Sequence, residues 1–145
     1  MGTKVSSVLK NKGYDVVSVA PHQIVASVVE VLTQNRIGAA PVINEEGQLI
    51  GIISERDIIR GMSRHAAAVL TLPAEHLMTR DVRTCSSEDQ LVEIMQVMTV
   101  HRIRHLPVVQ NGTLQGIVSI GDVVKQRLEE VQSEAEELRS YIRSP

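Results

Sequence analysis

The sequence has almost no aromatic residues: it contains no tryptophan and no phenylalanine, and its two tyrosines are Tyr14 and Tyr141. Proteins that bind single-stranded nucleic acids stack the bases on aromatic side chains. The chain also lacks the basic excess on which sequence-independent nucleic-acid binding depends, since its formal net charge is -2 and its pI is near 6.2. Nucleic acid is therefore not an expected partner.

Cysteine is represented by one residue, Cys85, so no disulfide can form within the chain. Cys85 lies in a strand-like run with no evident base, so we do not expect it to be a nucleophile. No apolar run approaches the about 18 residues needed to span a membrane, and the N-terminal residues form no apolar signal segment. The expected location is the cytoplasm, with no membrane partner.

One motif occurs twice. Residues 51–57 read Gly-Ile-Ile-Ser-Glu-Arg-Asp, and residues 116–122 read Gly-Ile-Val-Ser-Ile-Gly-Asp. The similarity extends, with one gap, over 15–60 and 81–125, and the residues of the first copy that recur include Arg36, Ile37, Pro41, Val42, Gly47, Leu49, Gly51, Ile52, Ser54 and Asp57. Two copies of this length do not make a solenoid array, so the sequence predicts a paired module.

Each copy has the predicted order strand, helix, strand, strand, helix. In the first copy these are a strand at 16–19, a helix over 24–32, and strands at 40–43 and 49–53. In the second copy they are a helix from residue 91, capped by Ser-Ser-Glu-Asp at 86–89, and strands at 106–109 and 114–118. Asn111-Gly112 is a strong hairpin signal. The predicted fold class is α+β (mixed α/β), with two tandem βαββα repeats.

The repeat also gives boundaries. We predict repeat 1 at residues 5–62, a connector at 63–76, repeat 2 at 77–127 and a C-terminal helical extension at 128–145. Apolar residues at alternating spacings of four and three form a heptad seam in this long helix: Val124, Leu128, Val131, Ala135, Leu138 and Ile142. The helix either lies on its own domain or joins two chains. We favour a homodimer, because the chain has little core left to cover.

Ser54 with Asp57, and Ser119 with Asp122, have the spacing of a helix capping box, in which each residue satisfies a backbone N–H of the other. The same place is where a helix N-terminus offers N–H groups and positive dipole to a phosphate, and where a carboxylate can accept from a ribose diol. Capping alone explains either motif taken singly. The presence of two copies after glycine-bounded strands favours ligand binding.

Other candidate chemistry is sparse. His101 and His105 have a four-residue spacing, but their segment ends in a strand with arginines interleaved, so we expect no metal site. Arg104 and His105 precede Pro107, where the first copy has Gly38 and Ala39, and they are either surface charges or part of a site. The sequence contains no nucleophile elbow, Walker loop or dinucleotide fingerprint, so we do not expect an enzyme.

The doubled pattern of Arg-Ile, Pro-Val, a turn and Gly-x-x-Ser-x-x-Asp resembles the CBS domain family, named from cystathionine beta-synthase, over residues 5–127. The resemblance is to stand-alone tandem CBS proteins. It implies two repeats related by a pseudo-twofold axis, often dimerised into a flat disc. Its usual ligands are AMP, ADP, ATP, NAD(H) or S-adenosylmethionine. Serine stands in both motifs where the strongest family pattern has threonine, which keeps the hydroxyl.

In such pairs, each cleft combines the serine and aspartate of one helix start with the first strand and pre-proline segment of the other repeat. The resemblance implies that Ser54, Arg56 and Asp57 face Arg83, Thr84, Ile103, Arg104 and His105. It implies that Ser119 and Asp122 face Val17, Ser18, Ile37, Gly38 and Ala39. We expect the first cleft to be the stronger phosphate site, because Arg56 and Arg104 can give charge-assisted hydrogen bonds, whereas Gly121 replaces Arg56 in the second.

These observations predict a non-catalytic regulatory module that binds an adenosyl ligand, AMP first, between the repeats and passes a conformational signal to an unknown regulated protein. The alternative is a structural dimerisation adaptor with vestigial clefts. An enzyme acting on the bound nucleotide is a third hypothesis, and it lacks a positioned base or metal set.

Overall fold

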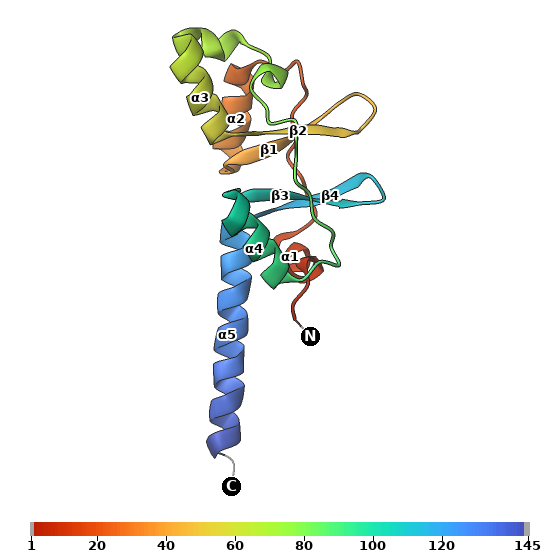
Figure 1. The fold of residues 1–145 in the computed structure, drawn as a ribbon, viewed down its shortest axis with the longest axis vertical. Helices are drawn as coiled ribbons and strands as arrows, with labels where there is room; N and C mark the ends of the chain where they lie inside the picture. The colour runs from red at the N-terminus through yellow and green to blue at the C-terminus, as the bar shows by residue number, and fades with distance from the viewer. Residues whose placement is uncertain (1, 144–145) are drawn as a thin grey trace. The chain divides into compact units, whose positions relative to one another are not determined.

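The computed structural model describes residues 2–143, so the last two residues of the predicted 128–145 extension lie outside the described part (Figure 1). The helices are α1 (Val5–Lys12), α2 (Val25–Asn35), α3 (Glu55–His65), α4 (Leu91–His101) and α5 (Ile120–Arg143). The strands are β1 (Ala39–Ile43), β2 (Leu49–Ser54), β3 (His105–Gln110) and β4 (Thr113–Ser119). Two 3₁₀ turns, Ala66–Thr71 and Ala74–His76, form the connector. The α+β fold class and the long C-terminal helix are confirmed.

The described chain divides into two compact units. One contains residues 2–14, 85–108 and 116–143, and the other contains residues 15–84 and 109–115. Helix α1 was not predicted from the sequence, and it belongs with the second repeat. The backbone N–H of Val5 donates to the carbonyl of Asp89 at 2.9 Å, and that of Leu91 donates to the carbonyl of Thr3 at 2.8 Å. The boundaries drawn from the repeat describe sequence similarity and stay a prediction.

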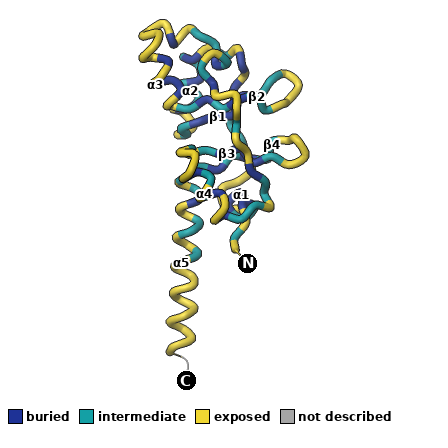
Figure 2. The backbone as a smooth tube through the Cα atoms, viewed as in Figure 1, coloured by how far each residue is buried: buried dark blue, intermediate teal, exposed yellow. Residues whose placement is uncertain are grey.

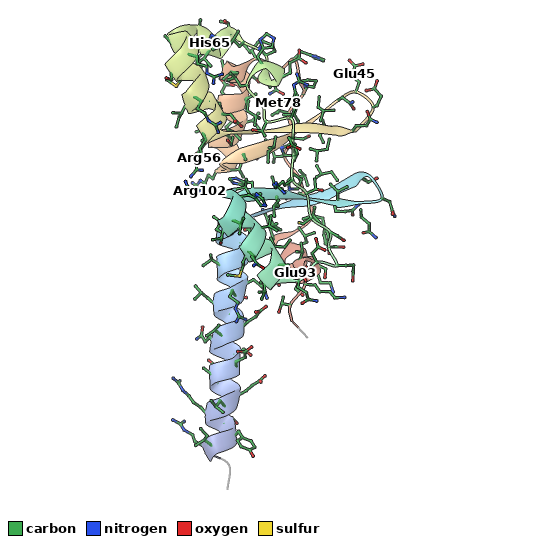
Figure 3. All side chains as sticks on the ribbon, in the orientation of Figure 1. Glu45, Arg56, His65, Met78, Glu93 and Arg102 are labelled. Atoms are coloured by element: carbon green, nitrogen blue, oxygen red, sulfur yellow. The ribbon has the colours of Figure 1, made fainter. Side chains whose placement is uncertain are left out.

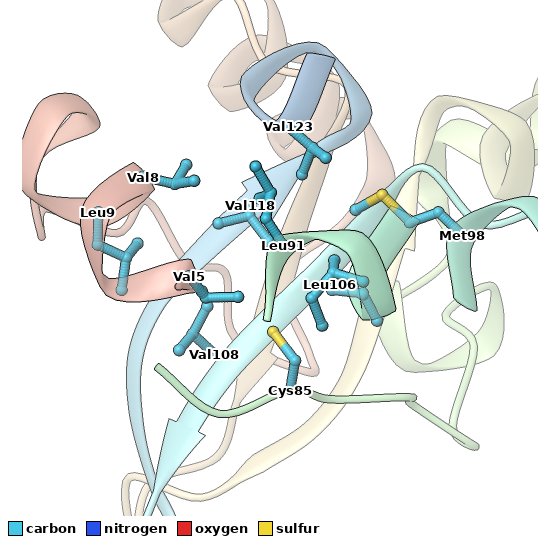
Figure 4. Packing of buried hydrophobic residues seen from close by; sticks show 11 residues of the cluster. Val5, Val8, Leu9, Cys85, Leu91, Met98, Leu106, Val108, Val118 and Val123 are labelled. Carbon is cyan, nitrogen blue, oxygen red and sulfur yellow. The ribbon is translucent and has the colours of Figure 1, made fainter. Parts of the chain in front are cut away.

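The first of these units has a core of buried aliphatic side chains (Figure 4). Val5, Val8 and Leu9 of α1 enter this core, and each is at most 3% exposed. They pack in one cluster with Leu91, Ile94, Met98, Leu106, Val108, Val118 and Val123. Because buried apolar area stabilises the fold by about 25 cal/mol per Å², α1 is an integral part of this unit.

The other unit packs α2 on the β1–β2 hairpin. Val25, Val28 and Leu32 recur on one face of α2, and all three are buried. They share a cluster with Val42 and Ile53 of the hairpin. The strands are antiparallel, and the register pairs Ala39 with Ser54 and Val42 with Gly51. This register brings the end of β2 beside the start of β1.

The β3–β4 hairpin turns at the predicted dipeptide. Asn111 and Gly112 both have positive φ, at 51° and 76°. Two successive residues with positive φ are the requirement of a type I′ turn, and Asn-Gly meets it at little cost. The loop between β1 and β2 instead depends on Asn44, whose side-chain oxygen accepts from the backbone N–H groups of Glu46 and Gln48. Both predicted hairpins are confirmed.

Two local predictions were wrong. The strand expected at 16–19 is reduced to one parallel bridge between Val19 and Val42, and Cys85 forms the matching bridge with Val108. Residues 86–89 do not cap α4. Ser86 and Asp89 bond to each other in a turn, and the N-cap is Gln90, which has no side-chain capping bond among the described residues. The carbonyl of Thr3 replaces that cap by accepting from Leu91, a contact that local sequence does not encode.

The repeated Arg-Ile pair is a helix stop. Arg36 and Arg102 end α2 and α4 in the left-handed region, with φ of 53° and 54°. The N–H of Ile37 donates to Leu32, and that of Ile103 donates to Met98, which is the long bond of a Schellman motif. Both isoleucines then pack against the core of their unit. The pair recurs because both helices end in this way.

Candidate functional site

The first candidate half-site is the junction of β2 and α3. The Oγ of Ser54 accepts from the backbone N–H of Asp57 at 3.3 Å. In return, Asp57 Oδ2 accepts from the backbone N–H of Ser54 at 2.9 Å and from its hydroxyl at 3.0 Å. This is the predicted capping box, and it fixes the carboxylate at the helix N-terminus. Asp57 is 6% exposed.

The second carboxylate oxygen of Asp57 faces a hydroxyl. Thr79 Oγ1 donates to Asp57 Oδ1 at 3.2 Å, and the guanidinium of Arg60 lies 3.6 Å from the same oxygen. Thr79 is held there by two backbone hydrogen bonds with Ile52, of 3.0 and 2.8 Å. The repeated glycine, Gly51, allows this approach, since a Cβ on it would lie 2.5 Å from the sulfur of Met78, labelled in Figure 3.

The second candidate half-site, at the junction of β4 and α5, has the same capping pair. Asp122 Oδ2 accepts from the backbone N–H of Ser119 at 2.8 Å, and Ser119 Oγ accepts from that of Asp122 at 3.1 Å. The difference is Lys12, whose ammonium donates to Asp122 Oδ2 at 2.7 Å and to the carbonyl of Ile117 at 2.7 Å. Both aspartates therefore have a cation nearby, but Asp122 accepts a short hydrogen bond from its cation, whereas Asp57 accepts from a hydroxyl and lies 3.6 Å from Arg60.

The pKa of Asp122 reflects this environment. Desolvation by burial acts to raise it, but the hydrogen bond and the charge of Lys12, together with the bonds from Ser119, outweigh burial and lower the pKa below the usual value for aspartate. The carboxylate is thus ionised and paired at neutral pH. A cavity of about 220 Å³ beside it is lined by Val8, Asn11, Lys12, Asp122, Lys125, Gln126 and Glu129.

Sequence reasoning missed both Thr79 and Lys12. In the register that matches Asp15 with Asp81, Lys12 stands opposite Met78 and Gly13 stands opposite Thr79. These residues precede the aligned repeats, and nothing in their local pattern indicates a role. The signal that was available is positional: each lies just before one of the aligned segments, 15–60 and 81–125, and each contacts the aspartate of a serine-aspartate helix start.

Each pre-proline segment is joined to the helix start of its own repeat. The N–H of Glu55 donates to the carbonyl of Gly38 at 3.0 Å, and the N–H of Ile120 donates to that of Arg104 at 2.8 Å. One unit therefore brings Ile37, Gly38 and Ala39 to Ser54, Arg56 and Asp57. The other brings Ile103, Arg104 and His105 to Ser119 and Asp122.

The remaining predicted site residues lie in the extended segments before the two bridges. Val17 is half-buried, and Ser18, Arg83 and Thr84 are exposed. Arg56 and Arg104 are also exposed. The pairing of each helix start with the first strand and pre-proline segment of the other repeat stays a prediction.

Within residues 2–143, no three or more His, Cys, Asp or Glu side chains are grouped so that they could hold a metal ion. Nor does this part of the chain contain a helix both long and apolar enough to cross a membrane.

Comparison with known proteins identifies the double motif. A family model described as "CBS domain" matches residues 5–64 and 74–129. A mitochondrial CBS domain-containing protein of Arabidopsis thaliana is 33% identical over 148 residues, which covers 97% of this chain and 72% of that protein. The crystal structure of a CBS-domain containing protein from Agrobacterium tumefaciens is similar with a TM-score of 0.84 and 39% identity, covering 88% of this chain and 95% of that one.

A third similarity concerns a structure with ligands. The CBS domain pair of protein MJ0100, solved in complex with 5′-methylthioadenosine and S-adenosyl-L-methionine, matches with a TM-score of 0.76 and 23% identity. The match covers 86% of this chain and 98% of that one. At this identity, the likeness is one of fold.

Proposed function

Because the chain belongs to the CBS domain family, with one CBS domain in each repeat, we propose that it is a non-catalytic regulatory module that binds an adenine nucleotide between the repeats. AMP is the first candidate ligand, and ADP, ATP, NAD(H) and S-adenosylmethionine belong to the same adenosyl class. The CBS domain pair of protein MJ0100, which has the same fold and binds two adenosyl compounds, supports an adenosyl ligand. Binding would shift an equilibrium between arrangements of the chain, which a regulated protein reads.

The observation that carries this proposal is the hydroxyl bond at Asp57. Its Oδ1 accepts from the hydroxyl of Thr79 at 3.2 Å, while its Oδ2 is committed to the capping box. A ribose diol presents hydroxyl donors of the same kind. The capping box therefore orients the carboxylate, and a ribose hydroxyl that took the place of the Thr79 hydroxyl would donate to Oδ1. The N-terminus of α3 and Arg56 supply positive potential for a phosphate.

The Asp122 half-site is the weaker of the two in this proposal. Its carboxylate already accepts from an ammonium, and Gly121 stands where the first half-site has Arg56. A ribose that reaches Asp122 must share or displace Lys12, which costs a partly exposed ion pair worth about 1 kcal/mol or less. The two motifs share their serine and aspartate, and the different partners of the two aspartates favour nucleotide binding through Ser54 and Asp57.

Calorimetric titration of AMP into the wild type, Asp57→Ala and Asp122→Ala tests the asymmetry. We expect Asp57→Ala to weaken binding about tenfold or more, since a hydrogen bond to a charged group is lost, and Asp122→Ala to weaken it less. Asp57→Asn is the matched control, because it keeps an acceptor for the cap and removes the charge. Equal losses in the two alanine variants, or no loss in either, would contradict the proposed difference.

A thermal-shift panel with AMP, ADP, ATP, NADH and S-adenosylmethionine tests the ligand class. A ligand that binds only the folded chain adds about 2.7 kcal/mol to the free energy of unfolding when its concentration is one hundred times its Kd, so the Tm rises. The absence of a shift with all five would overturn the nucleotide-binding function. It would favour the dimerisation adaptor, for which the exposed seam of α5 is the supporting observation: Leu128 and Leu138 are 64% and 60% exposed.

A further inference from the structure

The C-terminal half of α5 has an apolar face that its own chain does not cover. Every residue from 131 to 143 is exposed, as the yellow segment of α5 shows in Figure 2. Among them, Leu138 and Ile142 are 60% and 71% exposed. An isolated helix of fewer than about 12–15 residues is marginal in water, and helices in proteins are stabilised chiefly by packing an apolar face. This segment therefore needs a partner.

The apolar spacing on this face is that of a coiled coil. Written as heptads with Leu128 at position a, the seam alternates between positions a and d throughout. Positions a are Leu128, Ala135 and Ile142, and positions d are Val124, Val131 and Leu138. The flanking positions place Glu134 at g and Arg139 at e. Among the outer positions b, c and f within residues 124–142, the exposed residues are Glu129, Ser133, Glu136, Glu137 and Ser140.

We infer that α5 forms a parallel two-stranded coiled coil with α5 of a second copy of this chain. In a parallel pair, position g of one heptad lies beside position e of the following heptad on the other helix. Glu134 of each chain then lies beside Arg139 of the other, which gives two attractive ion pairs. Each of the six seam residues packs against its own counterpart, so the seam is self-complementary.

The charge pattern opposes the antiparallel arrangement. An antiparallel pair that buries the whole seam centres on Ser133 and sets Leu128 against Leu138 of the other chain. In this arrangement, position g of one helix lies beside position g of the other, and position e lies beside position e. Glu134 lies beside the second Glu134, and Lys125 lies beside Arg139, so like charges flank the seam on both sides. Like charges at such positions are destabilising, and they select partner orientation.

Disulfide trapping distinguishes the two orientations. In a parallel pair, residue 142 of one chain lies beside residue 142 of the other, whereas in the antiparallel pair the two are about 27 Å apart, since 18 residues of helix separate them. A disulfide needs Cα atoms within about 7 Å. The full chain with Ile142→Cys is therefore oxidised and run on a non-reducing gel, and Ser140→Cys, two residues away on the outer face, is the matched control.

We expect Ile142→Cys to form a covalent dimer and Ser140→Cys to form far less. The native Cys85 gives no background, because it is 7% exposed. Equal trapping of the two variants, or none in either, would overturn the parallel pair. Nucleotide is not needed in this experiment, so its result does not depend on whether the chain binds a nucleotide.

A charge exchange tests the pairing itself by sedimentation equilibrium. Glu134→Arg should raise the dimer Kd about fivefold, since two ion pairs worth about 0.5 kcal/mol each are lost. Adding Arg139→Glu to that variant should restore the affinity. Leu128→Glu or Leu138→Glu should abolish the dimer. A monomeric wild type, or a double variant no tighter than the single one, would overturn the inference.

Discussion

The ammonium of Lys12 donates to the carboxylate of Asp122 across 2.7 Å, and it thereby ties α1 to the start of α5. The contact spans most of the chain in sequence and lies within one compact unit. It also distinguishes Asp122 from Asp57, which has the hydroxyl of Thr79 as its partner. Two motifs that are alike in sequence thus have unlike electrostatic surroundings.

The Lys12–Asp122 pair predicts a dependence of stability on pH. The folded pKa of Asp122 is lowered, so the unfolded chain binds more protons, and the stabilisation is fully present above the unfolded pKa of about 4. It is lost as the pH falls through the folded pKa. Lys12→Met should therefore lower the free energy of unfolding at pH 7 by about 1 kcal/mol or less, because both side chains are partly exposed.

Urea unfolding between pH 7 and pH 3 measures this difference. The difference in the free energy of unfolding between the wild type and Lys12→Met should become smaller as the pH falls below about 4. Lys10→Met removes a charge from the same helix at an exposed position and serves as the control. A gap that is constant over the whole pH range would show that Lys12 contributes only through packing.

The repeated glycines should differ in their tolerance of alanine. A Cβ on Gly51 would lie 2.5 Å from the sulfur of Met78 and 3.0 Å from the backbone oxygen of Thr79. A Cβ on Gly116 would lie 2.8 Å from a terminal methyl group of Leu9, and its three nearest neighbours are all side-chain atoms. We expect Gly51→Ala to cost about 1–3 kcal/mol of unfolding free energy and Gly116→Ala to cost less. Chemical denaturation of both variants checks the order, and the reverse order would refute it.

The helix stop at Arg102 predicts a contrast between two substitutions. Its φ of 54° is left-handed, which glycine adopts freely and a β-branched residue adopts with strain. Arg102→Val should lower the free energy of unfolding by about 1–2 kcal/mol, whereas Arg102→Gly should leave it unchanged or slightly raised. Since the arginine side chain is exposed, its loss alone contributes little, and Arg102→Lys is the control. Equal effects of valine and glycine would contradict the Schellman geometry.

Cys85 should be unreactive while the chain is folded. Burial, and to a lesser extent the charge of Asp89, raise the pKa of its thiol to about 12. At pH 8, a thiol with that pKa is ionised in roughly one molecule in ten thousand, and the thiolate is the nucleophile. Labelling with a thiol reagent should be negligible in buffer and complete in denaturant. Rapid labelling of the native chain would place Cys85 outside the core.

Much of the fold was readable from the sequence because its signals are local. Asn111-Gly112 specifies a hairpin turn through backbone conformation alone, and Ser54 with Asp57 forms a cap within one helical turn. The recurrence of these signals in a second copy identified the family. The misassigned cap at Ser86 and Asp89 marks the limit, because the α4 terminus is completed by Thr3, far away in the chain.

The sequence by itself determined the two-repeat architecture, the family and the residue types at each helix start, since each depends on spacing within a short segment. The tertiary structure decided that α1 packs with the second repeat and that Lys12 neutralises Asp122 while Thr79 contacts Asp57. Such contacts arise only when the core of each unit brings distant segments together, and no local pattern carries that information.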